Sequence, residues 1–180
     1  GELAESAMEK IRNSDGLVLE TVKEGKTNRK PQAPFTTESM LRAANGRMGW
    51  SIGRTNRVAT ALYQSGHITY IRTDSTRTSK AARDRIRSLI EKEYGSNHLG
   101  PGALGPDAKK GASNVQDAHE AIRPTQPEVK TLTDVDSDQQ SLYRLIWGRF
   151  AASQMSDSVR ERRDLVAKAS NLELQLYGTS

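Results

Sequence analysis

The sequence predicts a mainly α-helical fold with a few short β-strands. In several stretches apolar side chains recur three and four residues apart, which is the period of one face of a helix. Three of these stretches follow a serine or threonine that can cap a helix, and each of the three precedes a glycine that can end it. With 34% hydrophobic and 27% charged residues, the chain is expected to form modest cores under a highly charged surface.

The first thirty residues are predicted to pass from regular structure into an exposed linker. Residues 2–12 are expected to be helical because Leu3, Ala7 and Ile11 are four residues apart on one face. After a turn at 13–16, residues 17–22 alternate as a short strand. Residues 24–34 are polar and lack a period, so they predict a linker and a domain boundary near Lys30.

Two helices and a strand are predicted between residues 36 and 71. Thr36 or Thr37 can cap the first helix, which Gly49 ends, and Ser51 can cap the second, which ends at Gly66. The expected inward side chains are Met40, Leu41, Ala44 and Met48, then Val58, Ala59, Leu62 and Tyr63, with Arg54 and Arg57 outward. Residues 68–71 are β-branched or aromatic and predict the strand. This outline is that of a winged helix-turn-helix, which usually binds DNA, although such helix pairs also occur as ordinary packing.

The segment from Gly66 to Thr78 has the densest chemistry of the chain. On a strand Tyr70 and Arg72 share a face. A free tyrosine has a pKa of about 10 and is a weak nucleophile at neutral pH, so a nearby guanidinium would favour the phenolate, or would instead grip a phosphate. Cations outnumber carboxylates next to the predicted strand, with Arg72, Arg77, Lys80, Arg83, Arg85 and Arg87 against Asp74 and Asp84. The pattern suggests attack on a phosphodiester; the alternative is that Tyr70 packs in a core or at its rim.

A third helix and a long loop follow. The helix is capped by Ser79 and ends at Gly95, with a stripe of Ala82, Ile86, Leu89 and Ile90. The basic residues on its other face could contact the phosphates of a nucleic acid, or they could form an ordinary solvated helix face. The loop, residues 96–113, contains a G-x-G-x-x-G pattern at Gly100, Gly102 and Gly105. No strand precedes the pattern and no helix follows it, so nucleotide binding is not predicted.

The last third of the chain predicts one long helix and a hairpin. Residues 116–125 are expected to form a helical turn ended by Pro124, with His119 and Arg123 on one face. The acidic run 134–138 lacks the glycine and glutamate of an EF-hand, so no metal site is predicted there, and Ser137 with Gln140 is expected to form a capping box. The helix spans about 138–155, with a stripe of Leu142, Leu145, Ile146 and Phe150. Residues 165–169 and 172–177 alternate as a hairpin expected to rejoin the domain begun at 1–29.

Composition restricts the class of protein. The net charge of +5 and the pI near 9.6 fit a polyanionic partner. With no cysteine, disulfides and thiolate metal sites are excluded. No apolar run approaches the roughly 18 residues of a membrane span, and the first residues lack a signal-peptide pattern, so a cytoplasmic protein is expected. The chain starts at Gly1 without a methionine, which suggests an excised fragment.

Four stretches resemble one family in the same order along the chain. The segment Ile68-Thr69-Tyr70-Ile71-Arg72-Thr73-Asp74-Ser75-Thr76-Arg77 resembles the active-site tyrosine segment of type IA DNA topoisomerases, in the bacterial topoisomerase I branch. The other three are residues 33–37, residues 116–125, and residues 142–147 with 152–155. Four ordered matches are far more specific than any one of them.

The resemblance implies a mechanism and a set of site residues. Tyr70 would attack a DNA phosphodiester to give a 5′-phosphotyrosine, and Arg72 would position the scissile phosphate. The expected DNA-binding residues are His119, Arg123, Thr73, Asp74, Ser75 and Arg77. The partner would be single-stranded or negatively supercoiled DNA, relaxed without ATP, and the protein is expected to be a monomer.

The resemblance also implies a domain arrangement. A winged-helix-like tyrosine domain, residues 30–159, would be inserted into an arch-like β domain represented by residues 1–29 and 160–180. Magnesium would serve the full-length enzyme through an acidic cluster and a catalytic lysine of which this chain has no counterpart. The chain by itself is therefore expected to bind no metal and to be inactive in relaxation. Two alternatives stay open: a non-catalytic winged-helix DNA-binding module, and an interaction fragment with no nucleic-acid role.

Overall fold

The computed structural model describes residues 18–103, 120–169 and 172–179, and its chain divides into two compact units. One unit is Lys30–Asp157, and the other consists of Gly1–Arg29 and Ser158–Ser180. The helix and turn predicted over residues 2–16 lie outside the described residues, as do His119 and most of the predicted loop.

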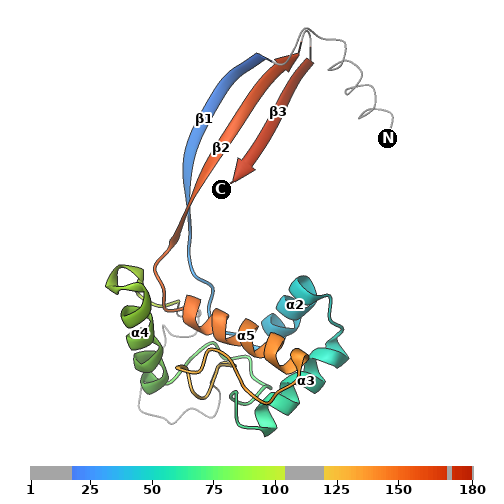
Figure 1. The fold of residues 1–180 in the computed structure, drawn as a ribbon, viewed down its shortest axis with the longest axis vertical. Coiled ribbons are helices and arrows are strands. Elements are labelled where there is room, and N and C mark those ends of the chain that lie inside the picture. The colour runs from blue at the N-terminus through green and yellow to red at the C-terminus, as the bar shows by residue number, and fades with distance from the viewer. Residues whose placement is uncertain (1–17, 104–119, 170–171, 180) are drawn as a thin grey trace. The chain divides into compact units, whose positions relative to one another are not determined.

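The unit made of Gly1–Arg29 and Ser158–Ser180 contains a three-stranded antiparallel sheet (Figure 1). Its strands are β1 (Val18–Arg29), β2 (Ser158–Ala169) and β3 (Leu172–Thr179), in the order β1-β2-β3. Ala169 pairs with Leu172, so β2 and β3 form the predicted hairpin. Arg29 pairs with Ser158 at the other end of the register.

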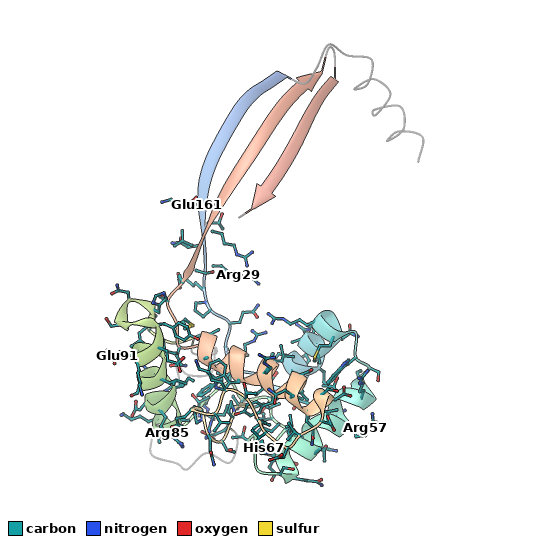
Figure 2. The ribbon with its side chains drawn as sticks, viewed as in Figure 1. Arg29, Arg57, His67, Arg85, Glu91 and Glu161 are labelled. Carbon is teal, nitrogen blue, oxygen red and sulfur yellow. The ribbon has the colours of Figure 1, made fainter. Side chains whose placement is uncertain are left out.

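The linker predicted from residue 24 is wrong for residues 24–29, because β1 continues to Arg29. The polar residues just before Arg163 likewise belong to a strand, β2, in which Glu161 pairs with Lys26 of β1. Residues 25–29 and 158–161 are exposed, so this part of the ribbon has no apolar face to reveal it in the sequence. The side chains of Arg29 and Glu161 are drawn on the ribbon in Figure 2. Backbone pairing, which the partner strand supplies, decides the structure here.

The second unit is helical, as predicted. Its helices are α2 (Thr37–Met48), α3 (Ile52–Gln64), α4 (Lys80–Tyr94) and α5 (Ser137–Ala152), with a short 3₁₀ helix η1 (Ser96–His98). Thr36, Ser51 and Ser79 cap α2, α3 and α4 through their side-chain oxygens, which confirms those predictions. The capping box of α5 uses Asp136 and Gln139, one residue earlier than predicted.

Two apolar clusters hold the helical unit together, and α5 contributes to both. The larger cluster packs α2, α3 and α5 around the fully buried Phe35 and Ile122. The smaller one packs Ile86 and Ile90 of α4 against Phe150. Trp147 contacts both clusters, and α5 lies between α4 and the α2–α3 pair (Figure 1). Each large apolar side chain buried in this way contributes roughly 1.5–3 kcal/mol of transfer free energy.

The described part of the glycine pattern after α4 serves packing. Leu99 forms a β-bridge with Met155, just after α5. A Cβ atom on Gly100 would lie 2.2 Å from the carbonyl oxygen of Met155, so only glycine fits this approach. Gly102 has a φ of +85° beside the side chain of Gln154. These two glycines therefore let the chain dock against the end of α5.

Candidate active site around Tyr70

Tyr70 lies on an extended segment that is not a regular strand. Only Ile68 takes part in a β-bridge, with Pro124, so the strand predicted over residues 68–71 is wrong. From Tyr70 to Ser75 the residues nevertheless alternate between exposed and buried. Tyr70, which is 50% exposed, and Arg72 are therefore both accessible, with the buried Ile71 between them.

Thr37 holds the segment on the side of Arg72. Its hydroxyl donates to the carbonyl of Ile71 at 2.7 Å and accepts the backbone N–H of Thr73 at 2.9 Å. Its own N–H donates to the carbonyl of Thr73 at 2.9 Å. Because these bonds flank Arg72, the first residue of α2 fixes the backbone from which the guanidinium extends.

Thr69 holds the segment on the other side of Tyr70. Its N–H donates to the carbonyl of Arg123 at 2.9 Å, and its hydroxyl accepts the N–H of Arg123 at 3.0 Å. The same hydroxyl donates to the carbonyl of Ala121 at 2.7 Å. The tyrosine is thus flanked on both sides by residues whose backbone positions are fixed.

Residues 120–125 are extended, so the helical turn predicted there is wrong. Ile122 pairs with Phe35 and Pro124 pairs with Ile68. Pairing with segments distant in sequence overrides the local helical spacing, and Pro124 has no N–H to give a helix. As a result, three of the four stretches that resemble one family lie side by side around Tyr70.

Arg123 is directed into this junction. Its side chain is only 11% exposed and forms an ion pair with Glu120 at 2.5 Å. Glu120 also accepts the N–H of Ser79, the N-cap residue of α4. The pair therefore links residues 120–123 to the start of α4, a structural role that sequence spacing did not indicate.

A cavity of about 860 Å³ opens beside Arg72. It lies between the start of α2, the middle of α3 and the segment 71–74, and its lining residues are Thr36, Thr37, Glu38, Asn56, Thr60, Ile71, Arg72, Thr73 and Asp74. Arg72 is in none of the ion pairs found among the described residues. The cavity is therefore lined by a cation, two carboxylates and several hydroxyl groups, a composition suited to a polar ligand.

The other predicted site residues of this segment differ in exposure. Thr73 and Ser75 are buried, and their hydroxyls accept the N–H groups of Ser75 and Arg77 at 3.0 and 3.1 Å. These are local side-chain to backbone bonds that shape the chain. Asp74 and Arg77 are exposed, so they are accessible to a ligand.

Tyr63 was expected to face inward but lies at the surface. It is 42% exposed, and its ring meets that of Tyr70 edge to face, with centroids 5.4 Å apart. The helical stripe favoured burial because Tyr63 follows Leu62, yet the side chain lies at the exposed edge of α3. No signal in the sequence distinguishes these two outcomes.

The basic face of α4 is largely committed to intramolecular contacts. Arg85 forms a two-pronged ion pair with Glu128 at 2.5 and 2.7 Å, and its cation lowers the pKa of that carboxyl. Lys80 pairs with Asp84 at 2.7 Å, and Arg87 donates to the carbonyl of Gly100 at 2.8 Å. Arg85 and the exposed Glu91 are labelled on α4 in Figure 2. This face accordingly offers fewer free cations than its sequence suggests.

Within residues 18–103, 120–169 and 172–179, no group of three or more His, Cys, Asp or Glu side chains is arranged to hold a metal ion. The described residues therefore do not form a site for the magnesium ion that the resemblance implies. In the same part of the chain, no helix has the length and apolar character needed to cross a bilayer.

The sequence of the chain is similar to those of known proteins. Residues 1–180 match the family model described as DNA topoisomerase. The chain is 38% identical over 177 residues to DNA topoisomerase 1 of Escherichia coli, which covers 97% of this chain and 20% of that protein. It is 36% identical over 184 residues to DNA topoisomerase 1 of Thermotoga maritima, covering 96% of this chain and 28% of that protein.

A solved structure of a topoisomerase I has a similar fold. Full-length topoisomerase I from Thermotoga maritima superposes with a TM-score of 0.69 at 33% identity, over 97% of this chain and 29% of that one. The fold is similar to that of a type IA DNA topoisomerase, and the family resemblance found in the sequence is confirmed. The chain belongs to the bacterial DNA topoisomerase I family. It spans less than a third of the length of these relatives.

Proposed function

We propose that Tyr70 is the nucleophile of an ATP-independent DNA isomerase that cleaves and reseals one strand and thereby relaxes negative supercoils. The observation that carries the proposal is the exposed phenol of Tyr70, held between two fixed backbone positions and followed two residues later by the exposed Arg72. If Tyr70 merely packed in a core, its side chain would be expected to be buried. Its 50% exposure argues against that alternative.

The proposed chemistry is a transesterification. The phenolic oxygen loses its proton and attacks the phosphorus of a DNA phosphodiester; the bond from phosphorus to the 3′ oxygen breaks, and that oxygen leaves as a 3′-hydroxyl after gaining a proton. The 5′ phosphate is then esterified to Tyr70. Resealing is the reverse reaction, and it needs no nucleotide because one phosphate ester is exchanged for another.

Arg72 is proposed to hold the scissile phosphate and to stabilise its developing charge. Its guanidinium is exposed at the cavity and can grip two phosphate oxygens. Among the remaining predicted DNA contacts, we propose that the exposed Asp74 and Arg77 contact DNA directly. The buried Thr73, Ser75 and Arg123 would act indirectly, by shaping the backbone of the site. His119, which lies outside the described residues, is proposed to contact DNA on the family resemblance alone.

We further propose that residues 30–159 are the winged-helix-like tyrosine domain, inserted between two pieces of an arch-like β domain at 1–29 and 160–180. The division of the chain after Arg29 and after Asp157 supports this arrangement. The magnesium ion would be held by regions of the relatives that this chain does not match. On this proposal the chain alone binds single-stranded DNA in a salt-sensitive way but does not relax a supercoiled plasmid.

The test uses a chimera in which this chain replaces the matching 177 residues of the E. coli relative. With magnesium and an end-labelled single-stranded oligonucleotide, we expect a protein–DNA adduct that survives denaturant. Tyr70→Phe should abolish the adduct while retaining oligonucleotide binding. The matched control is Tyr94→Phe, since Tyr94 is equally exposed but lies on α4. Binding without any adduct in the unsubstituted chimera would favour the non-catalytic winged-helix module, and no binding at low salt would favour an interaction fragment.

A second variant tests Arg72. Arg72→Ala is expected to slow adduct formation by about 10²–10³-fold, the usual cost of removing one charge-stabilising donor. Arg57→Ala is the control, because Arg57 is an exposed arginine on α3 (Figure 2) that does not line the cavity. Equal losses in the two variants would mean that general positive charge matters and that Arg72 has no special role.

A further inference from the structure

The contact between Tyr63 and Tyr70 brings together two tyrosines that are seven residues apart. Tyr63 is in the last turn of α3, and Tyr70 follows the turn that ends this helix. Their rings lie edge to face at an interplanar angle of 63°. Both are among the few large apolar side chains that the described part of the chain leaves exposed, so neither ring is held in place by a surrounding core.

The backbone between them is fixed by a helix-ending motif. The N–H of Gly66 donates to the carbonyl of Tyr63 at 2.9 Å, and the N–H of His67 donates to that of Leu62 at 2.9 Å. These two bonds define a Schellman motif, and Gly66 has the left-handed φ of +74° that it requires. Figure 2 labels His67 just beyond this turn. The chain reverses at a set geometry and returns past the end of α3.

Beyond the turn, hydrogen bonds again fix the backbone. Thr125 donates its N–H to the carbonyl of His67 at 3.1 Å, and Thr69 makes the bonds to Ala121 and Arg123 described above. The Cα positions of Tyr63 and Tyr70 are therefore both determined by hydrogen bonding. What remains free at Tyr70 is rotation of its own side chain, and the ring of Tyr63 is the aromatic group that contacts it.

A freely rotating phenol would present its oxygen to a phosphate for only part of the time. An edge-to-face contact favours the rotamer that makes it, and in this rotamer half of the surface of Tyr70 stays exposed. Preorganisation of this kind lowers the cost of reaching the reactive geometry.

We propose that Tyr63 is a positioning residue for Tyr70: its ring selects the side-chain rotamer from which the phenolic oxygen attacks the phosphodiester. The proposal rests on the function proposed above for Tyr70. The competing role, in which Tyr63 stacks on a DNA base, predicts a loss of DNA affinity instead.

The kinetic test measures cleavage and binding separately in the chimera. Tyr63→Leu is expected to slow single-turnover adduct formation by about 2- to 10-fold, the range of one aromatic pair. The oligonucleotide Kd should stay within about 2-fold, and Tyr63→Phe, which keeps the ring, should restore the parent rate. An unchanged rate in Tyr63→Leu overturns the proposal. So does a Kd that weakens as much as the rate falls, since that outcome supports base stacking.

A spectroscopic test does not depend on catalysis. In the 180-residue chain with isotope-labelled tyrosine rings, the ring resonances of Tyr70 should shift in Tyr63→Leu, because the ring current of Tyr63 is lost. They should stay unchanged in Tyr94→Phe. A Tyr70 signal that is insensitive to Tyr63→Leu overturns the proposed contact.

In the kinetic test, a parent chimera that forms no adduct overturns both proposals, whereas a parent adduct with an unaffected Leu variant overturns this one alone.

Discussion

Thr37 and Thr73 are joined by two reciprocal hydrogen bonds across 36 residues of sequence. The N–H of Thr37 donates to the carbonyl of Thr73, and the N–H of Thr73 donates to the hydroxyl of Thr37, both at 2.9 Å. The first turn of α2 is thereby tied to the segment that carries Tyr70 and Arg72. The side chain of Thr37, the first residue of α2, thus helps to fix the backbone of a segment that is distant in sequence.

The first prediction concerns this hydroxyl. Thr37→Val keeps the shape of the side chain but leaves the N–H of Thr73 and the carbonyl of Ile71 without their partner, which should cost about 1–3 kcal/mol in the free energy of unfolding. Thr37→Ser should recover most of the loss. Urea unfolding followed by tryptophan fluorescence measures it, because both tryptophans lie in the helical unit.

Thr60→Val is the control for that experiment. The hydroxyl of Thr60 donates only to the carbonyl of Asn56 within its own helix, so its removal should change stability little. If Thr37→Val proved no more costly than Thr60→Val, the tie between α2 and the tyrosine segment would not be a significant source of stability.

The second prediction concerns acid stability. Arg54 binds Asp138 through two hydrogen bonds of 2.8 and 2.9 Å and thereby lowers the pKa of Asp138 below its usual 3.8. A carboxyl with a lowered folded-state pKa stabilises the protein above its unfolded pKa, and this contribution is lost as the pH falls through the folded value. Asp138→Asn should therefore make the unfolding free energy less dependent on pH in the range from about pH 5 to 2.

Glu91→Gln serves as the matched control for Asp138, because Glu91 is an exposed carboxyl on α4. Parallel profiles for all three proteins would show that the pair between α3 and α5 does not contribute to acid stability.

The third prediction concerns alkaline pH. Tyr143 is buried and donates its hydroxyl to the carbonyl of Val129 at 2.5 Å; burial, and secondarily the charge of Glu128, raises its pKa to about 12. A tyrosine whose folded pKa is raised stabilises the protein below its unfolded pKa of 10.0, and the contribution is lost as the pH rises toward the folded value. Tyrosinate absorbance should show a late ionisation step that is absent in Tyr143→Phe and kept in Tyr94→Phe. A late step that persists in Tyr143→Phe would assign it to another residue.

The fourth prediction uses two glycines with opposite surroundings. Gly100→Ala should destabilise the helical unit by about 1–3 kcal/mol, because the new Cβ would overlap the carbonyl of Met155. Gly148→Ala, in the interior of α5 with nothing near the new Cβ, should stabilise it by roughly 0.5–1 kcal/mol. Thermal unfolding of the two variants gives the signs. Destabilisation by both would mean that the space around the new Cβ does not determine the sign of the effect.

The helices are the part of this protein that the sequence by itself determined. The capping residues Thr36, Ser51 and Ser79, the helix-ending Gly49 and the buried stripe of α4 were all predicted and are confirmed. These features depend on hydrogen bonds and side-chain contacts between residues a few positions apart, so a short window of sequence contains the necessary information. The ordered resemblance of four stretches likewise identified the family.

The surroundings of Tyr70 were decided only by the tertiary structure. The extended course of residues 120–125 and the length of β1 both differ from local expectation, because each depends on pairing with a segment far away in sequence. A backbone group that finds its partner across 36 or more residues leaves no periodic signal near itself. The sequence identified Tyr70 as the candidate residue. The tertiary structure brought Thr37, Thr69 and the ring of Tyr63 close to the segment that contains it.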